Sequence, residues 1–251
     1  MVFTRSLLFP IGLTTFLLAI DGAITLGLVS SMVAFLHSSG RGPFPVAPPG
    51  GSPFLLTGEP ANLVVNQGHT TNAAGGTALI LVGFGGIIAL WLERRERKKW
   101  DRTSPAFYAW AVIVLLSWLL TLVALIYTFV ETSMTGGQVI DLGVAEANPP
   151  PAKYPNDRWT PENWYAAVLG LPLASDNLRR LIGGKLAAMR AWRWNLIALF
   201  ILGFVLLLLV VLELWRLRRR NTQRVSMVEV LSDPSEEGGG KSKGAALQLE
   251  R

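Results

Sequence analysis

Four long apolar segments restrict the fold of this chain more than any other feature of its sequence. Each is close to the roughly 20 residues that an α-helix needs to cross a hydrocarbon layer about 30 Å thick. Hydrophobic residues make up 51% of the chain and charged residues only 16%, a balance that is typical of membrane proteins. We therefore predict an all-α integral membrane fold, a four-helix transmembrane bundle with spans at about Ile11–Leu36, Ala73–Leu92, Ala106–Val130 and Trp194–Trp215.

The first apolar segment is predicted to be a retained span, although Arg5 in front of it is also typical of a signal peptide. The segment is too long for the central region of a signal peptide. In addition, Asp21 lies in the sequence AIDGAIT, where cleavage requires a small residue. We therefore expect this segment to stay in the membrane.

Positive charge is concentrated beside the apolar segments. The sequence ERRERKKWDR (Glu93–Arg102) carries six Lys and Arg residues, and RLRRRNTQR (Arg216–Arg224) carries five. The positive-inside rule places both sequences in the cytoplasm, and with them the N- and C-termini. Because the charge follows the membrane boundaries, it predicts no nucleic-acid partner.

The same two basic sequences are candidates for contact with anionic lipids. Each Lys or Arg close to an anionic leaflet contributes about 1 kcal/mol of binding. The alternative is that the charge only sets the topology and is otherwise solvated. The residues expected to contact lipid headgroups are Arg94, Arg95, Arg97, Lys98, Lys99, Arg216, Arg218, Arg219 and Arg220.

The spans divide the chain into a membrane domain, residues 1–225, and a polar, glycine-rich tail, residues 226–251, that is expected to be disordered. The outer loops are predicted at residues 37–72 and 131–193, and the inner loop at residues 93–105. The long connections therefore lie on the outer side of the membrane.

One outer loop contains a strand-like sequence, NLVVN (residues 62–66), in a region otherwise dense in Pro and Gly. Its expected partner is GGQVIDLGV (residues 136–144) in the other outer loop, which has a similar β-branched character. We predict that these two segments pair as a small two-stranded β element over the bundle.

Asp21 is an acidic residue near the middle of the first span. Because an acid at this depth costs about 2.5–3.5 kcal/mol, we expect it to face the bundle, protonated, and to donate a hydrogen bond. It is interpreted either as a polar contact at a glycine-lined helix crossing or as a proton or cation site. A transport route needs several polar positions, which favours the structural interpretation. The predicted members of this contact are Asp21, Thr25, Gly83, Ser117 and Thr121.

The sequence contains no recognisable catalytic or metal-binding motif. It has no cysteine, which excludes disulfides and thiolate chemistry. Its two histidines, His37 and His69, have no third ligand at zinc-site spacing. We therefore predict no enzymatic activity, no metal and no cofactor.

The second outer loop is expected to contain a short helix followed by an amphipathic one. In RWTPENWYAAVLGLPL, Thr160 is a good N-cap, Pro161 suits the first helical position, and Gly170 ends the helix. A second helix is predicted from Ser175 or Asp176 into the fourth span, with a bend at the two glycines of its sequence LIGGKL. Its apolar and basic residues occupy opposite faces, which is typical of helices at a membrane surface.

Aromatic residues accumulate in this loop and at the start of the fourth span. They predict either a surface that packs on the bundle or one that binds a partner. The residues concerned are Trp159, Trp164, Tyr165, Trp192 and Trp194.

The sequence RWTPENWYAAVLGLPL, followed by MRAWRWNLIALFILG, resembles an uncharacterised family of four-span membrane proteins of filamentous fungi. The resemblance covers about residues 154–203 and implies a multi-pass protein without an established activity. In span number the chain is also similar to the MARVEL and SUR7-like tetraspan groups. It lacks the cysteine motif of the SUR7-like, claudin-like and tetraspanin proteins.

Together these features predict a non-enzymatic protein of the plasma membrane or an endomembrane that organises the membrane or partner proteins. Its expected partners are the bilayer, including anionic lipids, and a membrane protein or a second copy of the chain. The alternative is a small transporter or channel, or an accessory subunit of a membrane complex, that uses Asp21.

Overall fold

The fold is mostly helical and is described for residues 6–100 and 102–232 in a computed structural model. Four helices of the described chain are long and apolar enough to cross a membrane, which confirms the predicted number. The second is continuous but changes geometry, because a π-helix, η2, separates two α-helical parts. The bounds are α1 Leu8–Leu36, α2 Asn66–Gly76, η2 Thr77–Phe84, α3 Gly85–Trp100, α4 Pro105–Met134 and α7 Asp176–Ser232.

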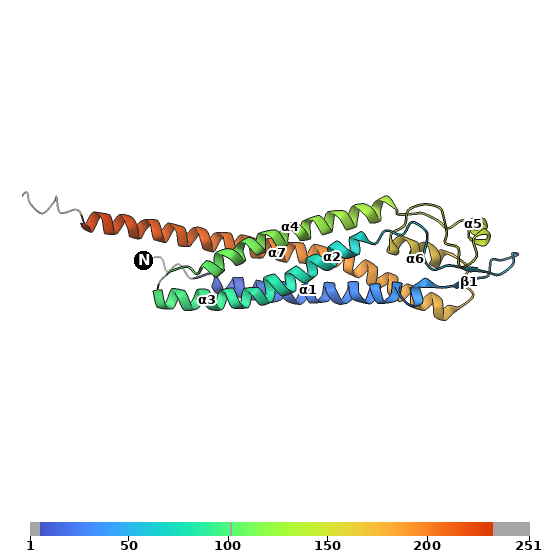
Figure 1. Cartoon of the computed structure of the whole chain (residues 1–251), viewed down its shortest axis with the longest axis horizontal. Coiled ribbons are helices and arrows are strands. Elements are labelled where there is room, and N and C mark those ends of the chain that lie inside the picture. The colour runs from blue at the N-terminus through green and yellow to red at the C-terminus, as the bar shows by residue number, and fades with distance from the viewer. Residues whose placement is uncertain (1–5, 101, 233–251) are drawn as a thin grey trace, which may run out of the picture.

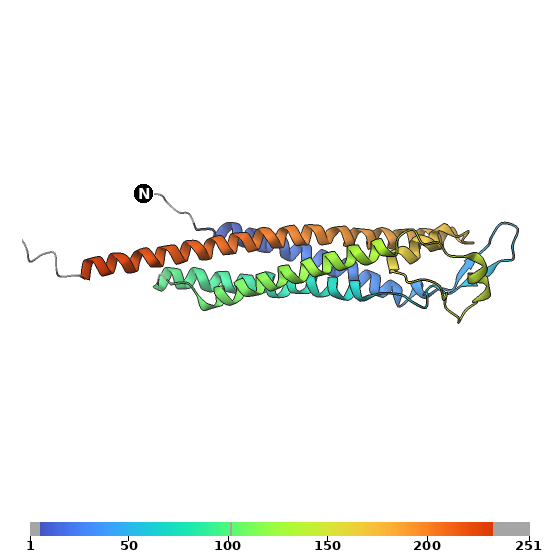
Figure 2. The same ribbon diagram turned by 90° about the horizontal axis from the view of Figure 1, so that it is seen from above.

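The four helices form an elongated antiparallel bundle (Figures 1 and 2). Helix α1 packs against α7 and against η2, while α4 packs against α7 and α2. The loops between α1 and α2 and between α4 and α7 gather at one end, which we call the lid end (Figure 1). Helix α1 begins and α7 ends at the opposite end, which we call the basic end. The two described ends of the chain therefore lie on the same side of the bundle.

The helices extend beyond the predicted apolar segments. The second begins at Asn66 and continues through the charged residues to Trp100. Helix α7 includes both the predicted amphipathic helix and the fourth span, and no break is assigned at Gly183 and Gly184. It also continues through residues 226–232, so this part of the predicted tail is helical; residues 233–251 lie outside the described chain. The apolar segment of a sequence identifies only the part of a helix that could cross a membrane. The helix itself continues through flanking Arg, Lys and Glu residues, because these are good helix formers.

The lid end contains the small sheet, but its location differs from the prediction. Strands β1, Phe44–Val46, and β2, Phe54–Leu56, pair as an antiparallel hairpin within one loop. The predicted strand at residues 62–66 makes only a single bridge, between Leu63 and Trp159, and the predicted partner at 136–144 runs into helix α5. A local hairpin closes a shorter loop than a pairing between distant segments, which lowers the entropy lost on pairing.

Two short helices complete the lid. Helix α5, Leu142–Ala147, is capped by Asp141, and helix α6, Pro161–Gly170, is capped by Thr160, whose side chain accepts a hydrogen bond from the Asn163 backbone N–H. The cap, the proline at the first position and the end at Gly170 confirm the predicted helix. A 3₁₀ turn, Ser39–Arg41, follows α1.

Small residues bring α1 and the second helix together in the middle of the bundle. A Cβ atom at Gly22 would lie 2.9 Å from the Gly75 carbonyl oxygen, and one at Gly83 would lie 2.7 Å from the Ala19 Cβ. Both distances are too short for a larger side chain. The helices therefore pack at glycines, as is common in membrane bundles.

Candidate functional site

Asp21 belongs to a buried polar cluster between α1 and α7. The side chain of Asn195 on α7 donates to Thr25 Oγ1, at 2.9 Å. Thr25 Oγ1 in turn donates to the Asp21 carbonyl oxygen, at 3.0 Å. In the described part of the chain, Asp21 Oδ2 is buried without a hydrogen-bond partner. The cluster links two helices and keeps one free acceptor.

The other three predicted members, Gly83, Ser117 and Thr121, make no hydrogen bond to Asp21 in the described chain. Gly83 is at the crossing with α1, against Ala19, and Ser117 and Thr121 are buried on α4. Thr121 Oγ1 donates to the Ser117 carbonyl oxygen of its own helix, at 2.9 Å. Sequence reasoning missed Asn195, although an amide in an apolar span carries the same signal as Asp21, because both are costly to bury alone.

Three of the predicted aromatic residues are buried inside the lid. Trp159 and Trp164 meet edge to face, with ring centroids 5.2 Å apart. Trp164 Nε1 donates to the Gly58 carbonyl oxygen, at 2.7 Å, and the Tyr165 hydroxyl donates to that of Gly40, at 2.9 Å. Each of the two bonds joins the second outer loop to the first. These three side chains are buried and pack inside the lid.

The remaining two aromatic residues lie on α7. Trp192 is buried, whereas Trp194 is 57% exposed and packs edge to face on Phe129, with centroids 5.4 Å apart. The Arg193 guanidinium lies over the Trp194 ring, at 5.6 Å. An exposed indole beside a cation at the start of an apolar segment is typical of a membrane boundary.

The lid is fastened to the bundle by polar contacts of α6. The Glu162 carboxylate pairs with Arg193, at 3.2 Å, and with Arg190, at 3.6 Å. Burial raises the pKa of Glu162, and the charges of Arg193 and Arg190 partly oppose this rise. Asn163 Nδ2 donates to the Thr132 carbonyl oxygen of α4, at 2.7 Å. Helix α6 is thus fixed to both α4 and α7.

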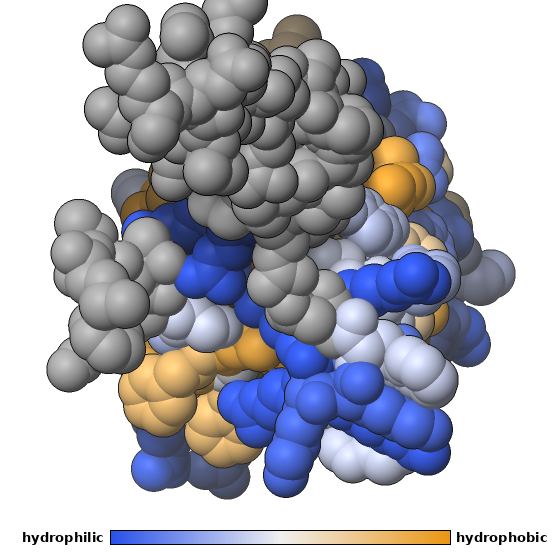
Figure 3. All heavy atoms as spheres, turned by 90° about the vertical axis from the view of Figure 1, so that its left-hand side faces the viewer, coloured by the Kyte–Doolittle hydropathy of each residue, from blue (hydrophilic) through white to orange (hydrophobic). Residues whose placement is uncertain are grey.

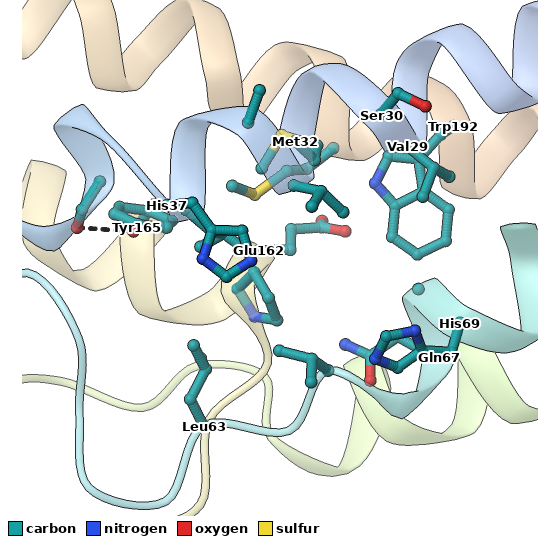
Figure 4. A pocket seen from close by; sticks show the side chains of 18 of the residues that line it. Val29, Ser30, Met32, His37, Leu63, Gln67, His69, Glu162, Tyr165 and Trp192 are labelled. Carbon is teal, nitrogen blue, oxygen red and sulfur yellow. Dashed lines mark hydrogen bonds between the residues drawn. The ribbon is translucent and has the colours of Figure 1, made fainter.

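A cavity of about 730 Å³ lies between the lid and the bundle. Its walls come from α1, α2, α6 and α7, and the side chains that line it converge from all four (Figure 4). His37 and His69, the two histidines of the chain, both line it. Within the described residues, no group of three or more potential ligands could hold a metal ion. The volume of the cavity and its mostly apolar wall make it a candidate site for a small organic ligand.

The basic end is closed by a buried ion-pair network that the sequence did not reveal. Arg97 bridges the carboxylates of Glu93 on α3 and Glu213 on α7, and both glutamates are buried. The other oxygen of Glu93 accepts from the Ser104 backbone N–H, at 2.7 Å, and that of Glu213 from the Leu7 N–H, at 3.3 Å. The network joins α1, α3, α4 and α7.

Arg97, predicted to contact lipid, is mostly buried and is engaged with these two carboxylates. Its guanidinium is directed to two carboxylates because Glu93, four residues earlier, lies on the same helix face. Two sequence features could have predicted this network: the i, i+4 spacing of Glu93 and Arg97, and the lone glutamate, Glu213, in the apolar sequence LLLLVVLELW.

Most of the other predicted lipid-contact residues are exposed at the basic end, where hydrophilic side chains gather (Figure 3). Three cations lie over tryptophan rings: Arg219 over Trp215 at 3.5 Å, Lys99 over Trp100 at 5.0 Å, and Arg95 over Trp91 at 5.7 Å. Arg94, Lys98, Arg218 and Arg220 are exposed, and Arg216 is partly buried. The end combines charge and aromatic rings, as a membrane–water boundary does.

Comparison of the chain with protein-family models, with curated proteins and with solved structures found no match. The resemblance to a four-span fungal family therefore stays a prediction. The geometry of the two bundle ends and of the Asp21 cluster is the basis for assigning a function.

Proposed function

We propose that the chain spans a plasma membrane or endomembrane four times, with its lid outside and its basic end in the cytoplasm. In this role it organises partner proteins in the membrane and catalyses no reaction. The four apolar helices and the concentration of cations at one end support this placement. Cleavage of the 93–102 loop by a protease added to sealed cells would contradict it.

The observation that carries the organising role is the construction of the lid. Segments from two loops are tied together by Trp164 and Tyr165 and fastened to the bundle by Glu162. Such a lid holds its outward face in a fixed shape, and a preformed surface binds a partner with a small loss of entropy. Val139 and Met134 are strongly exposed on the lid side, outside the predicted aromatic set. The occupant that fits this proposal is a membrane-protein partner; a second copy is the other outcome of its test.

The test compares the full-length protein with two tryptophan variants in cells. Trp164→Ala removes a buried ring and its bond to Gly58, which loosens the lid; Trp100→Ala makes the same chemical change at an exposed position of the basic end. Proximity labelling and co-purification should lose the partner in Trp164→Ala and keep it in Trp100→Ala. An unchanged partner set with a protease-sensitive lid would overturn the proposal. Recovery of tagged copies of the chain alone would identify self-association.

Transport is the second candidate function, and one observation favours it. Asp21 Oδ2 is a buried acceptor without a hydrogen-bond partner in the described chain, beside Asn195 and Thr25. Asp21→Asn keeps the shape but removes the ionisable group. The measurement is the flux of protons or cations into lipid vesicles. Under the organising role, vesicles with the wild type, vesicles with Asp21→Asn and empty vesicles all show the same flux. A flux that the wild type supports and Asp21→Asn abolishes would replace that role with transport.

In this proposal the exposed basic residues bind the headgroups of anionic lipids. Charge reversal of Arg218 and Arg219 together should reduce binding of the purified protein to anionic headgroups in the surrounding bilayer, because each cation contributes about 1 kcal/mol. The same change at Arg97 would disrupt the fold and is unsuitable as a probe.

A further inference from the structure

The cavity at the lid end has the size and wall chemistry of a ligand site. Its volume of about 730 Å³ lies within the range of roughly 300–1,000 Å³ that is common for small-molecule sites. Much of its wall is apolar, with Met32, Leu63, Met189 and Trp192 among the lining residues. The cavity lies between α1 and α2, and residues of α6 and α7 form its other walls (Figure 4).

Gln67 supplies a buried polar group with an unmet hydrogen bond in this wall. Its side chain is 2% exposed and lines the cavity, and its Oε1 has no partner among the described residues. An amide left in this state costs about 1–3 kcal/mol. Because an amide group can turn either its oxygen or its nitrogen to the same place, a hydroxyl group, which both donates and accepts, satisfies either orientation.

His37 adds a donor to the same wall. Its Nδ1 lies 3.3 Å from Arg41 Nη2, and a guanidinium group can only donate. Nδ1 therefore accepts in this contact, which leaves Nε2–H as the donor of the ring. The cavity thus combines an amide and an N–H donor on a mostly apolar wall.

The acidic groups of the cavity wall already have counter-charges. Glu162 pairs with Arg193 and Arg190, and Glu59 pairs with Lys153, at 3.1 Å. Arg41, the cation of the wall, is exposed to solvent and donates to His37 Nδ1. A ligand therefore does not need a charge of its own to neutralise the wall. The unmet hydrogen bond belongs to a neutral group, which favours an uncharged ligand.

The extent of the cavity favours a compact body. Along α1 and its C-cap, the lining residues run from Val29 to His37, which corresponds to roughly 12 Å at 1.5 Å per residue. A volume of about 730 Å³ over this length makes the cavity wide as well as short. A single acyl chain is narrow and would leave much of this width empty, whereas a rigid fused-ring system fills it.

We propose that this cavity binds a sterol, with the hydroxyl group at Gln67 and His37 and the ring body against Met32 and Trp192. The inference rests on the four-span placement given above, because that placement sets the lid end at the outer membrane boundary, where such a ligand is available. It does not depend on the organising role. Sterol binding would fix α1, α2 and the lid in one arrangement.

The test uses purified full-length protein in lipid nanodiscs and a photoreactive sterol that keeps its free hydroxyl group. Cross-links should fall on cavity-lining segments and be displaced by unlabelled sterol. Gln67→Leu should reduce labelling about tenfold, as the loss of one buried hydrogen bond predicts. Gln138→Leu is the matched control, since Gln138 also has an unpartnered buried Oε1 but does not line the cavity; it should stay within about twofold of the wild type.

Thermal unfolding separates ligand binding from a structural role of Gln67. Without sterol, Gln67→Leu should be at least as stable as the wild type, because the substitution removes an unpartnered oxygen. Added sterol should raise the Tm of the wild type and of Gln138→Leu, but not that of Gln67→Leu. Equal labelling of Gln67→Leu, stronger labelling by a photoreactive fatty acid or ceramide, or cross-links confined to the lipid-facing helix surfaces would overturn the proposal. These results would leave the partner test unaffected.

Discussion

The two ends of the bundle are closed by different means. At the basic end, one arginine holds two buried carboxylates from α3 and α7. At the lid end, neutral hydrogen bonds from Trp164 and Tyr165 to backbone carbonyls join two loops, and a cavity remains beneath them. Removal of one member of the ion network leaves buried charges unpaired, whereas removal of one neutral hydrogen bond from the lid costs less. The basic end is thus a charged junction between helices, and the lid end is a neutral junction between loops with a cavity beneath it.

The largest effect is expected from Arg97→Met. It leaves the buried Glu93 and Glu213 carboxyl groups without their cation, and removal of one partner from a buried ion pair costs about 3–5 kcal/mol. The measurement is the free energy of unfolding of the purified protein in detergent. Arg95→Met, at an exposed position, is the control and should cost less than about 1 kcal/mol. Equal stability of the two variants would mean that the network does not hold the basic end.

The lid end should respond next most strongly to Gly58→Ala. A Cβ atom at Gly58 would collide with backbone atoms of Gly40, Arg41 and Gly42, which no side-chain movement relieves. Overpacking of this kind costs about 1–3 kcal/mol. Gly68→Ala is the control, because its Cβ would meet no atom within 4 Å. Limited proteolysis of the lid should accelerate in Gly58→Ala alone; equal rates would show that the close approach is not needed.

Tyr165→Phe should cost about 1 kcal/mol at neutral pH, since it removes one buried hydrogen bond, to the Gly40 carbonyl oxygen. Burial, and to a smaller extent the charge of Glu59, raises the pKa of Tyr165 above its ordinary value. The tyrosine therefore stabilises the fold fully below about pH 10, and this contribution is lost as the pH rises further. The stability difference between the wild type and Tyr165→Phe should shrink in that range. A constant difference at alkaline pH would contradict the buried, neutral phenol.

The smallest expected effect is the pH dependence of Glu162. Burial raises its pKa above the ordinary value of 4.5, so its contribution to stability is full below pH 4.5 and is lost as the pH rises through the folded-state value. The Tm of the wild type relative to Glu162→Gln should therefore fall as the pH is raised from about 4.5 to 7. Parallel pH profiles of the two proteins would show that Arg193 and Arg190 compensate for burial completely.

Much of the helical framework could be predicted from the sequence, but the functional surfaces could not. The N-cap of α6 and the four apolar helices are set by residues that are close together in the sequence, and the structure contains all of them. The strand pairing was placed in the wrong loop segments, because two candidate β sequences do not reveal which partner is nearest in space. Likewise, the lid tryptophans carry the same sequence signal whether they pack inside a lid or face a partner.

The sequence by itself determined the number of membrane-sized helices, the start and end of α6, and the presence of a lone acid, Asp21, in the first span. The tertiary structure decided that Asn195 binds Thr25 beside Asp21, that Arg97 joins Glu93 to Glu213, and that a cavity remains below the lid. The physical reason is the range of the interactions. Helix formation and capping act over a few residues, whereas burial and ion pairing depend on which distant helices meet, and that is settled only when the bundle packs.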